Sequence, residues 1–251
     1  MNLKRWLALW GLCAMVPAQA TVSLLGTRLI LGAGNEVSIE AHNRSDQEVL
    51  LQAWLALPGS SDEAAVASDR PLPFVVTPAL LRLPGLGRQQ LRVLYQGQGM
   101  PTDRESLVHL YVLEIPQRSE AGQQLSIAVR QRINVFHRPP GLPGDPALAP
   151  AALRWSLSHE VAGRARLQVS NPTAFHVALL DLQLDGRAVR DYLLLAPGQR
   201  FDWPTPPHVA RQLTFKALTD YGGRRDYCAQ PTGQAAFSAR LLDTPLMAGD
   251  C

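Results

Sequence analysis

Short runs of apolar or alternating residues follow one another along the chain after residue 20, each bounded by Gly, Pro or polar clusters. Alternation with a period of two is typical of strands that bury one face, and no stretch shows a convincing helical period. The runs before residue 138 therefore predict an antiparallel sandwich of about 100 residues. Its seven predicted strands are Leu24–Ile30, Glu36–Ala41, Val49–Leu57, Phe74–Thr77, Gln89–Tyr95, Leu107–Ile115 and Leu125–Phe136.

A proline-rich segment, Arg138–Pro146, interrupts this pattern. Proline has no N–H to donate to a strand ladder, so the segment predicts a linker and a domain boundary near residue 140. The expected domains are 21–140 and a smaller 141–251, which makes the fold class all-β with two sandwiches. The strands expected in the second domain are Leu153–Ser158, Arg166–Ser170, Val177–Leu184, Tyr192–Leu195, Arg200–Trp203, Gln212–Thr219 and part of Ala235–Leu242.

Trp54 lies midway along the third predicted strand. An immunoglobulin-like sandwich places its core tryptophan at the corresponding point, so we expect Trp54 in the core of the first domain. The cysteine pair that accompanies this tryptophan in antibody domains is absent.

The first twenty residues have the order of a secretory signal peptide. Lys4 and Arg5 form a positive start, Trp6–Val16 is apolar, and Ala18-Gln19-Ala20 offers small residues for cleavage after Ala20. The apolar run is shorter than the ~20 residues that a membrane-spanning helix needs. The alternative is a buried N-terminal helix. The order of the three features favours export, with the leader removed and no stable insertion in the membrane.

Two cysteines, Cys228 and Cys251, remain after removal of the leader. In an oxidising compartment they are candidates for a disulfide worth about 3 kcal/mol. Free thiols and intermolecular pairing are the alternatives, since Cys251 ends the chain. Cys13, inside the leader, does not indicate a lipoprotein, because the bulky Leu12 precedes it where a small residue is expected.

The charge balance first suggests a basic protein, with a formal net charge of +3 from 24 Lys and Arg against 21 Asp and Glu. Removing Lys4 and Arg5 with the leader leaves 3 − 2 = +1. Basic clusters interleaved with aromatic residues, the pattern typical of nucleic-acid binding, are also missing. We therefore expect no nucleic-acid partner.

The chain carries no recognisable motif for catalysis or metal binding. No histidine stands three to five residues from another, and there is no C-x-x-C, so no zinc spacing is present. A G-x-S-x-G elbow, an S-x-x-K and a phosphate-binding glycine loop are also missing. We expect no catalytic residue, metal or cofactor, and an exported hydrolase has no supporting motif. The six histidines are His42, His109, His137, His159, His176 and His208.

Several segments in a fixed order resemble the periplasmic chaperones of the chaperone–usher pilus pathway, the PapD/FimC type. The combination D-R-E-S, then E-I-P, then F-x-R-P is the most specific part of the resemblance. The segments are Thr27–Ile30, Gln52–Leu55, Pro73–Pro78, Asp103–Leu107, Glu114–Pro116, Leu125–Arg130, Ile133–Pro139, Asn171–Thr173 and Thr219–Gly223.

The resemblance implies two immunoglobulin-like domains arranged in an L, with a cleft between them. It also implies that the strand beginning near Leu125 is lent to a pilus subunit that lacks a strand of its own. Leu125, Ile127 and Val129 fall at the family's donor positions. Alternation alone leaves open whether these side chains enter the subunit or the chaperone's own core.

The family anchors the subunit's C-terminal carboxylate with an arginine and a lysine, and the resemblance assigns the arginine to Arg28. Without the resemblance, Arg28 would read as an ordinary exposed strand residue. Asn134 occupies the lysine position. Either Arg132, one pleat away on the same face, supplies the second cation, or the anchor is weaker; the first hypothesis is preferred because it restores a positive pair. Glu105, Arg138 and Asp220 match a salt-bridge network between the domains.

The expected function is a non-enzymatic periplasmic chaperone that stabilises pilus or fimbrial subunits and delivers them to an outer-membrane usher. The strand edge that receives the subunit would also allow the free chaperone to associate with itself. The alternative is an exported two-domain immunoglobulin-like binding or adhesion module. Such a module would need neither a basic cleft nor exposed apolar donor residues.

Overall fold

The computed structural model describes residues 21–59, 72–117, 127–159, 165–205, 211–231, 235–242 and 251. The signal-peptide segment and the donor position Leu125 lie outside these residues. In the described part of the chain, no helix has the length and hydropathy that a membrane span needs.

The first half of the chain forms two facing sheets. One has the order β1-β3-β7-β5 and the other the order β2-β9-β8-β4-β6. Their inner faces share one apolar core that includes Leu31, Ile39, Leu51, Leu91 and Leu110. The strands are β1 (Val22–Leu24), β2 (Arg28–Leu31), β3 (Glu36–Asn43), β4 (Val49–Ala56), β5 (Phe74–Thr77), β6 (Leu80–Leu83), β7 (Arg88–Tyr95), β8 (Ser106–Pro116) and β9 (Val129–His137).

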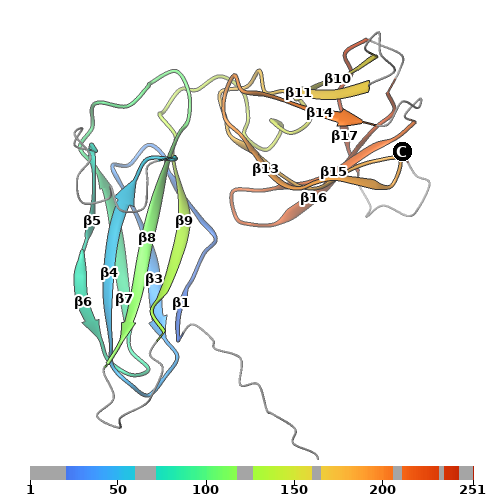
Figure 1. Cartoon of the computed structure of the whole chain (residues 1–251). Helices are drawn as coiled ribbons and strands as arrows, with labels where there is room; N and C mark the ends of the chain where they lie inside the picture. Colours follow the sequence, from blue (N-terminus) through green and yellow to red (C-terminus); the bar gives the residue numbers. More distant parts are fainter. Residues whose placement is uncertain are drawn as a thin grey trace, which may run out of the picture.

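The second half forms a smaller sandwich with its own core around Trp155, Phe215 and Tyr227. A sheet of order β10-β11-β14 faces one of order β13-β12-β15-β16-β17. The strands are β10 (Arg154–His159), β11 (Ala165–Ser170), β12 (Val177–Leu184), β13 (Arg187–Leu195), β14 (Arg200–Thr205), β15 (Leu213–Leu218), β16 (Arg224–Ala229) and β17 (Arg240–Leu241). Figure 1 shows the two sandwiches set at an angle, like the arms of an L.

The predicted single strand Leu24–Ile30 is wrong, because the chain changes sheets within it. β1 pairs with β3 in one sheet, whereas β2 pairs with β9 in the other. The crossing takes place around Gly26, whose φ of 152° is rarely adopted by residues with a side chain. This crossing decides which part of β9 has a neighbour.

Two strands were missed and two further expectations need correction. The predicted strand Leu125–Phe136 begins only at Val129 within the described residues. The strands β6 and β16 were not predicted, since β6 follows β5 after only two residues and β16 is rich in charge. Trp54 does not belong to the core: it lies on the outer side of β4, where its ring stacks on Tyr111 with the centroids 5.4 Å apart. Among the described residues, Trp155 in the second domain is the tryptophan that is fully buried.

Candidate functional site

The strand β9 has a neighbour along only part of one edge. On its other side it pairs with β8 over its whole length, from Val129 opposite Glu114 to His137 opposite Ser106. The parallel neighbour β2 covers only residues 134–137 of β9. Because β1 lies in the other sheet, residues 129–133 have no strand on this edge within the described part of the chain. We call this stretch the free edge of β9.

The side chains before and along the free edge grade from exposed to buried. Ile127 is 48% exposed, and Val129 is half-buried. Further along the same face, Ile133 and Val135 belong to the core of the first domain. Ile127 is therefore not part of the protein's own core, and its role as a donor residue stays a prediction. The third donor position, Leu125, lies outside the described residues.

Arg28 begins β2, directly beyond the free edge, and its guanidinium forms no ion pair with a described residue. Its Nε is buried without a hydrogen-bond partner among the described residues. Its Cζ lies 5.9 Å from the centroid of the Phe136 ring. Burial lowers the pKa of Arg28, against the opposing influence of Tyr192, Asp220 and Glu105. A partly buried, unpaired guanidinium is suited to bind a carboxylate, for which arginine offers two parallel N–H donors.

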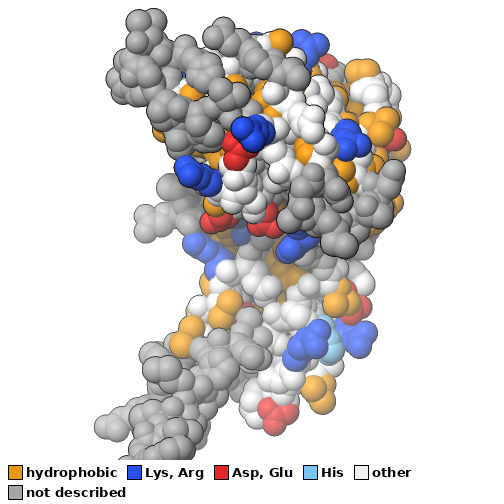
Figure 2. Space-filling model, turned by 90° about the vertical axis from the view of Figure 1, so that its right-hand side faces the viewer, with side chains coloured by type: hydrophobic (Ala, Val, Ile, Leu, Met, Phe, Trp, Pro, Cys, Tyr) orange, Lys and Arg blue, Asp and Glu red, His pale blue; other side chains and the backbone are white. Residues whose placement is uncertain are grey.

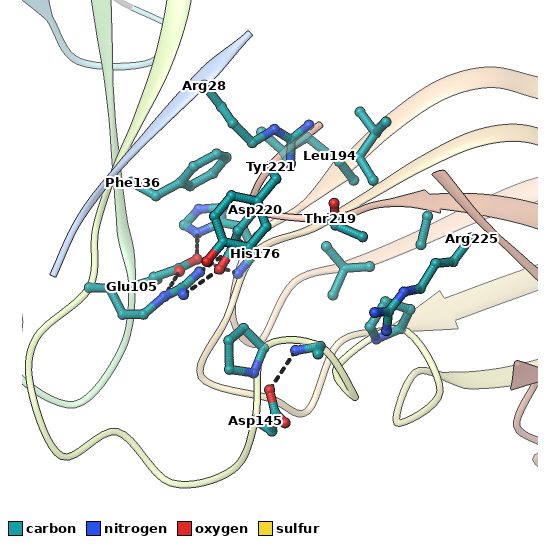
Figure 3. A pocket seen from close by; sticks show the side chains of 18 of the residues that line it. Arg28, Glu105, Phe136, Asp145, His176, Leu194, Thr219, Asp220, Tyr221 and Arg225 are labelled. Carbon is teal, nitrogen blue, oxygen red and sulfur yellow. Dashed lines mark hydrogen bonds and ion pairs between the residues drawn. The ribbon is translucent and has the colours of Figure 1, made fainter. Parts of the chain in front are cut away.

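A cleft of about 250 Å³ lies between the two domains beside Arg28. Its walls come from both domains: Phe136 lies on the side of the first, and Leu194, Tyr221 and Arg225 lie on the side of the second. Figure 3 shows Arg28 and Phe136 facing the residues of the second domain across this space. The cleft therefore combines the cations Arg28, Arg138 and Arg225 with acidic residues and with apolar and aromatic walls.

Asn134 and Arg132 lie near Arg28 but face a different hollow. Asn134 is the register partner of Arg28 on the adjacent strand. Arg132 is exposed, two residues earlier on the same face, and makes no ion pair with a described residue. Both line a second hollow of about 530 Å³, which shares Glu105 and His176 with the cleft beside Arg28. The structure thus places Arg132 next to the anchor region without bringing it into the same cleft as Arg28.

The three charges assigned to the interdomain network come together. Arg138 donates from Nε to Glu105 Oε1 at 2.6 Å, and from Nη1 and Nη2 to the Asp220 carboxylate at 2.6 and 2.9 Å. Burial opposes the charge of Arg138, but the hydrogen bonds and charges of Asp220 and Glu105 outweigh it and raise the pKa of Arg138. Only 3% of Glu105 is exposed. Arg138 therefore links the buried carboxylate of Glu105 in the first domain to that of Asp220 in the second. Figure 3 labels these two acidic residues.

The sequence resemblance is matched by comparisons with known protein families. The model of the PapD N-terminal domain, described as a pili and flagellar-assembly chaperone, matches residues 21–143. The model of the C-terminal domain of the pili assembly chaperone PapD matches residues 148–229. The chain belongs to the PapD family of pilus assembly chaperones.

Individual relatives agree with this assignment. The probable fimbrial chaperone YadV of Escherichia coli K12 is 31% identical over 81% of this chain and 87% of its own length. The chaperone protein FimB/FhaD of Bordetella pertussis is 31% identical over 87% of this chain and 91% of its own length. A chain in the structure of the Salmonella enterica SafA pilin in complex with the SafB chaperone has a TM-score of 0.69 and 26% identity. It covers 88% of this chain and 96% of that one.

The cysteines of this chaperone lie outside the site. Cys228, fully buried on β16, forms a disulfide with Cys251, and their Cα atoms lie 5.7 Å apart. The carbonyl of Cys251 also accepts a hydrogen bond from Gln230 Nε2 at 2.7 Å. The disulfide therefore ties the end of the chain to the second domain. In the residues that the structure describes, no group of three or more His, Cys, Asp or Glu is placed to hold a metal ion.

Two residues of the chaperone's cleft were missed by the sequence analysis. His176 donates its backbone N–H to Glu105 Oε2 at 2.8 Å, and its Nδ1 lies 3.1 Å from the same oxygen. Tyr221 is completely exposed at the tip of the β15–β16 hairpin, where a side chain on the adjacent Gly222 would meet Thr27 Oγ1 at 3.0 Å. Tyr221 could have been predicted, because it lies in the T-D-Y-G-G segment that is part of the resemblance. His176 could not, because nothing in the sequence around this isolated histidine indicates its contact with Glu105.

Proposed function

We propose that this protein is exported to the periplasm, with its leader cleaved after Ala20. There it stabilises pilus or fimbrial subunits by lending them the free edge of β9, and it delivers them to an outer-membrane usher. The observation that carries the proposal is the free edge itself, which ends at Arg28, whose buried Nε has no hydrogen-bond partner among the described residues. An open edge receives an added strand through main-chain hydrogen bonds, and alternate side chains provide specificity.

The charge at Arg28 selects the direction of the added strand. β2 runs parallel to β9, and Arg28 is its first residue, opposite Asn134. A partner strand on residues 129–133 that runs parallel to β9 therefore ends with its C-terminus directly before Arg28. An antiparallel strand would instead bring its positive N-terminus to the guanidinium. Arg28 thus favours a parallel partner strand whose terminal carboxylate it binds.

The donor side chains supply the apolar part of the interaction. Ile127 and Val129 lie on the face that continues the protein's own core, and Leu125 has the same parity. Full burial of each in a subunit groove contributes about 1.5–3 kcal/mol before the cost of association is subtracted. Folding of the subunit on the lent strand requires no ATP and no catalytic chemistry.

The second cation of the anchor is a separate part of the proposal. We assign it to Arg132, which is exposed, unpaired and on the same face as Asn134. A neutral hydrogen bond from Asn134 contributes about 0.5–1.5 kcal/mol, whereas a charge-assisted one contributes about 1.5–3 kcal/mol. A complex in which Arg132 points to solvent while the carboxylate contacts only Arg28 contradicts this assignment.

The interdomain network of Arg138 serves the same function by keeping the cleft in shape. Arg28 lies on the first domain, whereas Leu194 and Tyr221 lie on the second. A fixed angle between the domains therefore keeps the anchor and the opposite wall at a constant separation. The alternative, a binding or adhesion module without chaperone activity, gives no role to the free edge or to the unpaired Arg28.

The proposal is tested by co-purification of the chain with its subunit from periplasm. Ile127→Arg places a charge at an exposed donor position, so we expect capture to fall by at least a factor of about 100. The matched control is Leu241→Arg, at a comparably exposed position on the last strand of the second domain. Both variants should unfold at the temperature of the parent protein. Undiminished capture by Ile127→Arg rejects strand donation, and an equal loss in the control shows a nonspecific effect of charge.

A further inference from the structure

A buried carboxylate without a cation lies beside the first described residue of the chain. Glu114, near the end of β8, is only 4% exposed. Its Oε1 accepts hydrogen bonds from the backbone N–H of Thr21 at 3.2 Å and from the Thr21 hydroxyl, and its Oε2 accepts one from the N–H of Val22 at 3.0 Å. None of the described residues forms an ion pair with Glu114. Three neutral donors thus surround a negative group that burial penalises.

The nitrogen at the centre of this arrangement is the one that signal-peptide cleavage would release. Ala18-Gln19-Ala20 precedes Thr21 directly. Hydrolysis of the Ala20–Thr21 amide consumes one water and leaves a carboxylate on Ala20 and an amino group on Thr21. This amino group is largely protonated near pH 7, because an α-amino group has an ordinary pKa of about 7.7–8.0. The neutral N–H beside Glu114 then becomes an ammonium group at the same position.

We propose that Glu114 is a binding site for the new α-ammonium group of Thr21, so that cleavage after Ala20 completes a buried ion pair inside the first domain. The inference rests on the export that is part of the proposed function. The Thr21 nitrogen already lies within hydrogen-bond distance of the carboxylate, so the pair forms without rearrangement. A charge-assisted hydrogen bond is roughly twice as strong as a neutral one.

The ion pair lies beside the first residues of β9, where the free edge begins. Glu114 is the register partner of Val129, the first residue of β9. Gln131, on the same strand, donates from Nε2 to the carbonyl of Val22 at 2.8 Å. The residues that receive the new charge therefore also hold the beginning of the lent strand. The chain with its leader attached lacks the pair, so the donor edge is most firmly held only after export and processing.

The first step of the test is to identify the first residue of the protein purified from periplasm, by intact mass. The proposal requires Thr21, and any other first residue overturns it. The second step uses four full-length chains: one that begins at Thr21, one that retains Ala18-Gln19-Ala20, and the Glu114→Gln variant of each. Glutamine has the shape of glutamate and keeps one accepting oxygen, whereas its NH2 group faces donors on the other side. Glu114→Gln therefore removes the negative charge and one acceptor in both chains that carry it, so the comparison within that background isolates the effect of the extension.

We expect the three-residue extension to lower the thermal midpoint of the parent chain by roughly 4–8 °C. In the Glu114→Gln background, the extension should shift the midpoint by less than about 2 °C. An equal fall in both backgrounds indicates crowding by the extra residues and overturns the proposal, as does the absence of any fall. A selective reagent for α-amino groups provides a second measurement, because Thr21 should react more slowly in the parent than in Glu114→Gln. Equal reaction rates also overturn the proposal.

These measurements need no subunit and are therefore independent of strand donation. Loss of capture in Ile127→Arg with unchanged thermal shifts supports the proposed function alone. Thermal coupling between Thr21 and Glu114 in a chain that captures no subunit supports the ion pair alone. The two proposals can thus fail separately.

Discussion

Each of the two sandwiches contains a buried asparagine that holds a strand end to the loops around it. Asn43, at the end of β3, donates to three backbone carbonyls and accepts from the N–H and hydroxyl of Ser45. Asn171, just after β11, likewise donates to three carbonyls and accepts from the N–H and hydroxyl of Thr173. Both asparagines are at most 1% exposed. The two domains thus use the same N-x-S/T device at corresponding places.

The domains differ in what lies beside their last long strands. In the second domain, β16 has neighbours on both sides, β15 and β17, and the disulfide fastens Cys228 to the end of the chain. In the first domain, β9 has β8 on one side but only the short β2 on the other. Both late strands are covered along one edge over only part of their length, since β17 pairs with Tyr227 and Cys228 of β16 and β2 pairs with residues 134–137 of β9. They differ in what lies beside the uncovered part: the disulfide fastens β16 to the end of the chain, whereas the free edge of β9 leads to Arg28. The comparison teaches that a partly covered edge becomes a candidate binding edge through the groups placed beside it.

The surface charge does not distinguish the two domains. Figure 2 shows basic and acidic side chains interspersed over the visible face of both lobes. Ion pairs between neighbouring strands, such as Arg88 with Glu40, lie on the surface of the first domain. The charges that bear on function are those of three individual residues, Arg28, Glu114 and Arg138.

The largest expected effect comes from removing the asparagine that the domains share. Asn43→Ala leaves three buried carbonyls without a donor, so the free energy of unfolding of the first domain should fall by on the order of 4 kcal/mol. Asn171→Ala should do the same to the second domain alone. Urea unfolding followed by fluorescence measures each effect, since Trp54 and Trp155 lie in different domains. The exposed Asn35→Ala is the control, and a comparable loss there contradicts the argument.

Removing the link between the domains should have the next largest effect. Arg138→Ala leaves the buried Glu105 without its cation, which should destabilise the protein by about 3 kcal/mol. Small-angle scattering should show a wider range of angles between the domains, and subunit capture should weaken. Arg104→Ala, which removes an exposed pair with Asp103, should change neither. An unchanged scattering profile in Arg138→Ala would count against a structural role for the network.

Removing the disulfide takes away the covalent link between β16 and the end of the chain, a link for which β9 has no equivalent among the described residues. The double variant Cys228→Ala and Cys251→Ala should lower the stability of the second domain by about 2–3 kcal/mol, because it releases a loop with a sequence separation of 23. The first domain should unfold as before, and capture of the subunit should be retained. Calorimetry that resolves the two transitions is the measurement. A loss of stability in the first domain would show that the domains are coupled.

The smallest effect concerns pH and involves the first domain alone. His137 is buried beside Phe74 and Tyr95, and burial lowers the pKa of His137 from its ordinary value of 6.5. The unfolded chain therefore takes up a proton before the folded one does. Stability from His137 is complete above pH 6.5 and is lost as pH falls through the folded-state pKa.

Replacing this histidine tests the pH dependence directly. His137→Phe should make the thermal midpoint fall less steeply between pH 7 and 5, and His42→Phe, at a histidine outside the core, serves as the control. The same steepness in His137→Phe and the parent protein would assign the acid sensitivity to other groups.

Local sequence patterns predicted most of the strands, because a buried face imposes alternation whatever the neighbours are. The same patterns failed where pairing with distant strands determined the sheet or the face on which a residue lies. The run Leu24–Ile30 looks like one strand, but it is divided between two sheets around Gly26. Trp54 has a suitable position for a core residue, but its parity places it on the outer face of β4. The boundary near residue 140 stays a prediction.

Only part of the candidate site could be predicted from the sequence. The resemblance selected Arg28, Glu105, Arg138 and Asp220, and the structure places them around one cleft. Only the structure reveals that Arg132 faces the adjoining hollow and that His176 supports Glu105. These contacts join residues up to 82 positions apart, as between Arg138 and Asp220, and no local spacing encodes such a distance.

By itself, the amino-acid sequence determined the all-β class, the two-domain organisation and the family, and it predicts an export signal. These properties depend on alternation, turn residues and motifs that act over a few neighbouring positions. Among the described residues, the tertiary structure decided which part of β9 lacks a neighbouring strand, that the Nε of Arg28 is buried without a hydrogen-bond partner, and that the carboxylate of Glu114 lies beside Thr21. These properties depend on sheet crossing, register and burial, which arise only when distant segments pack together.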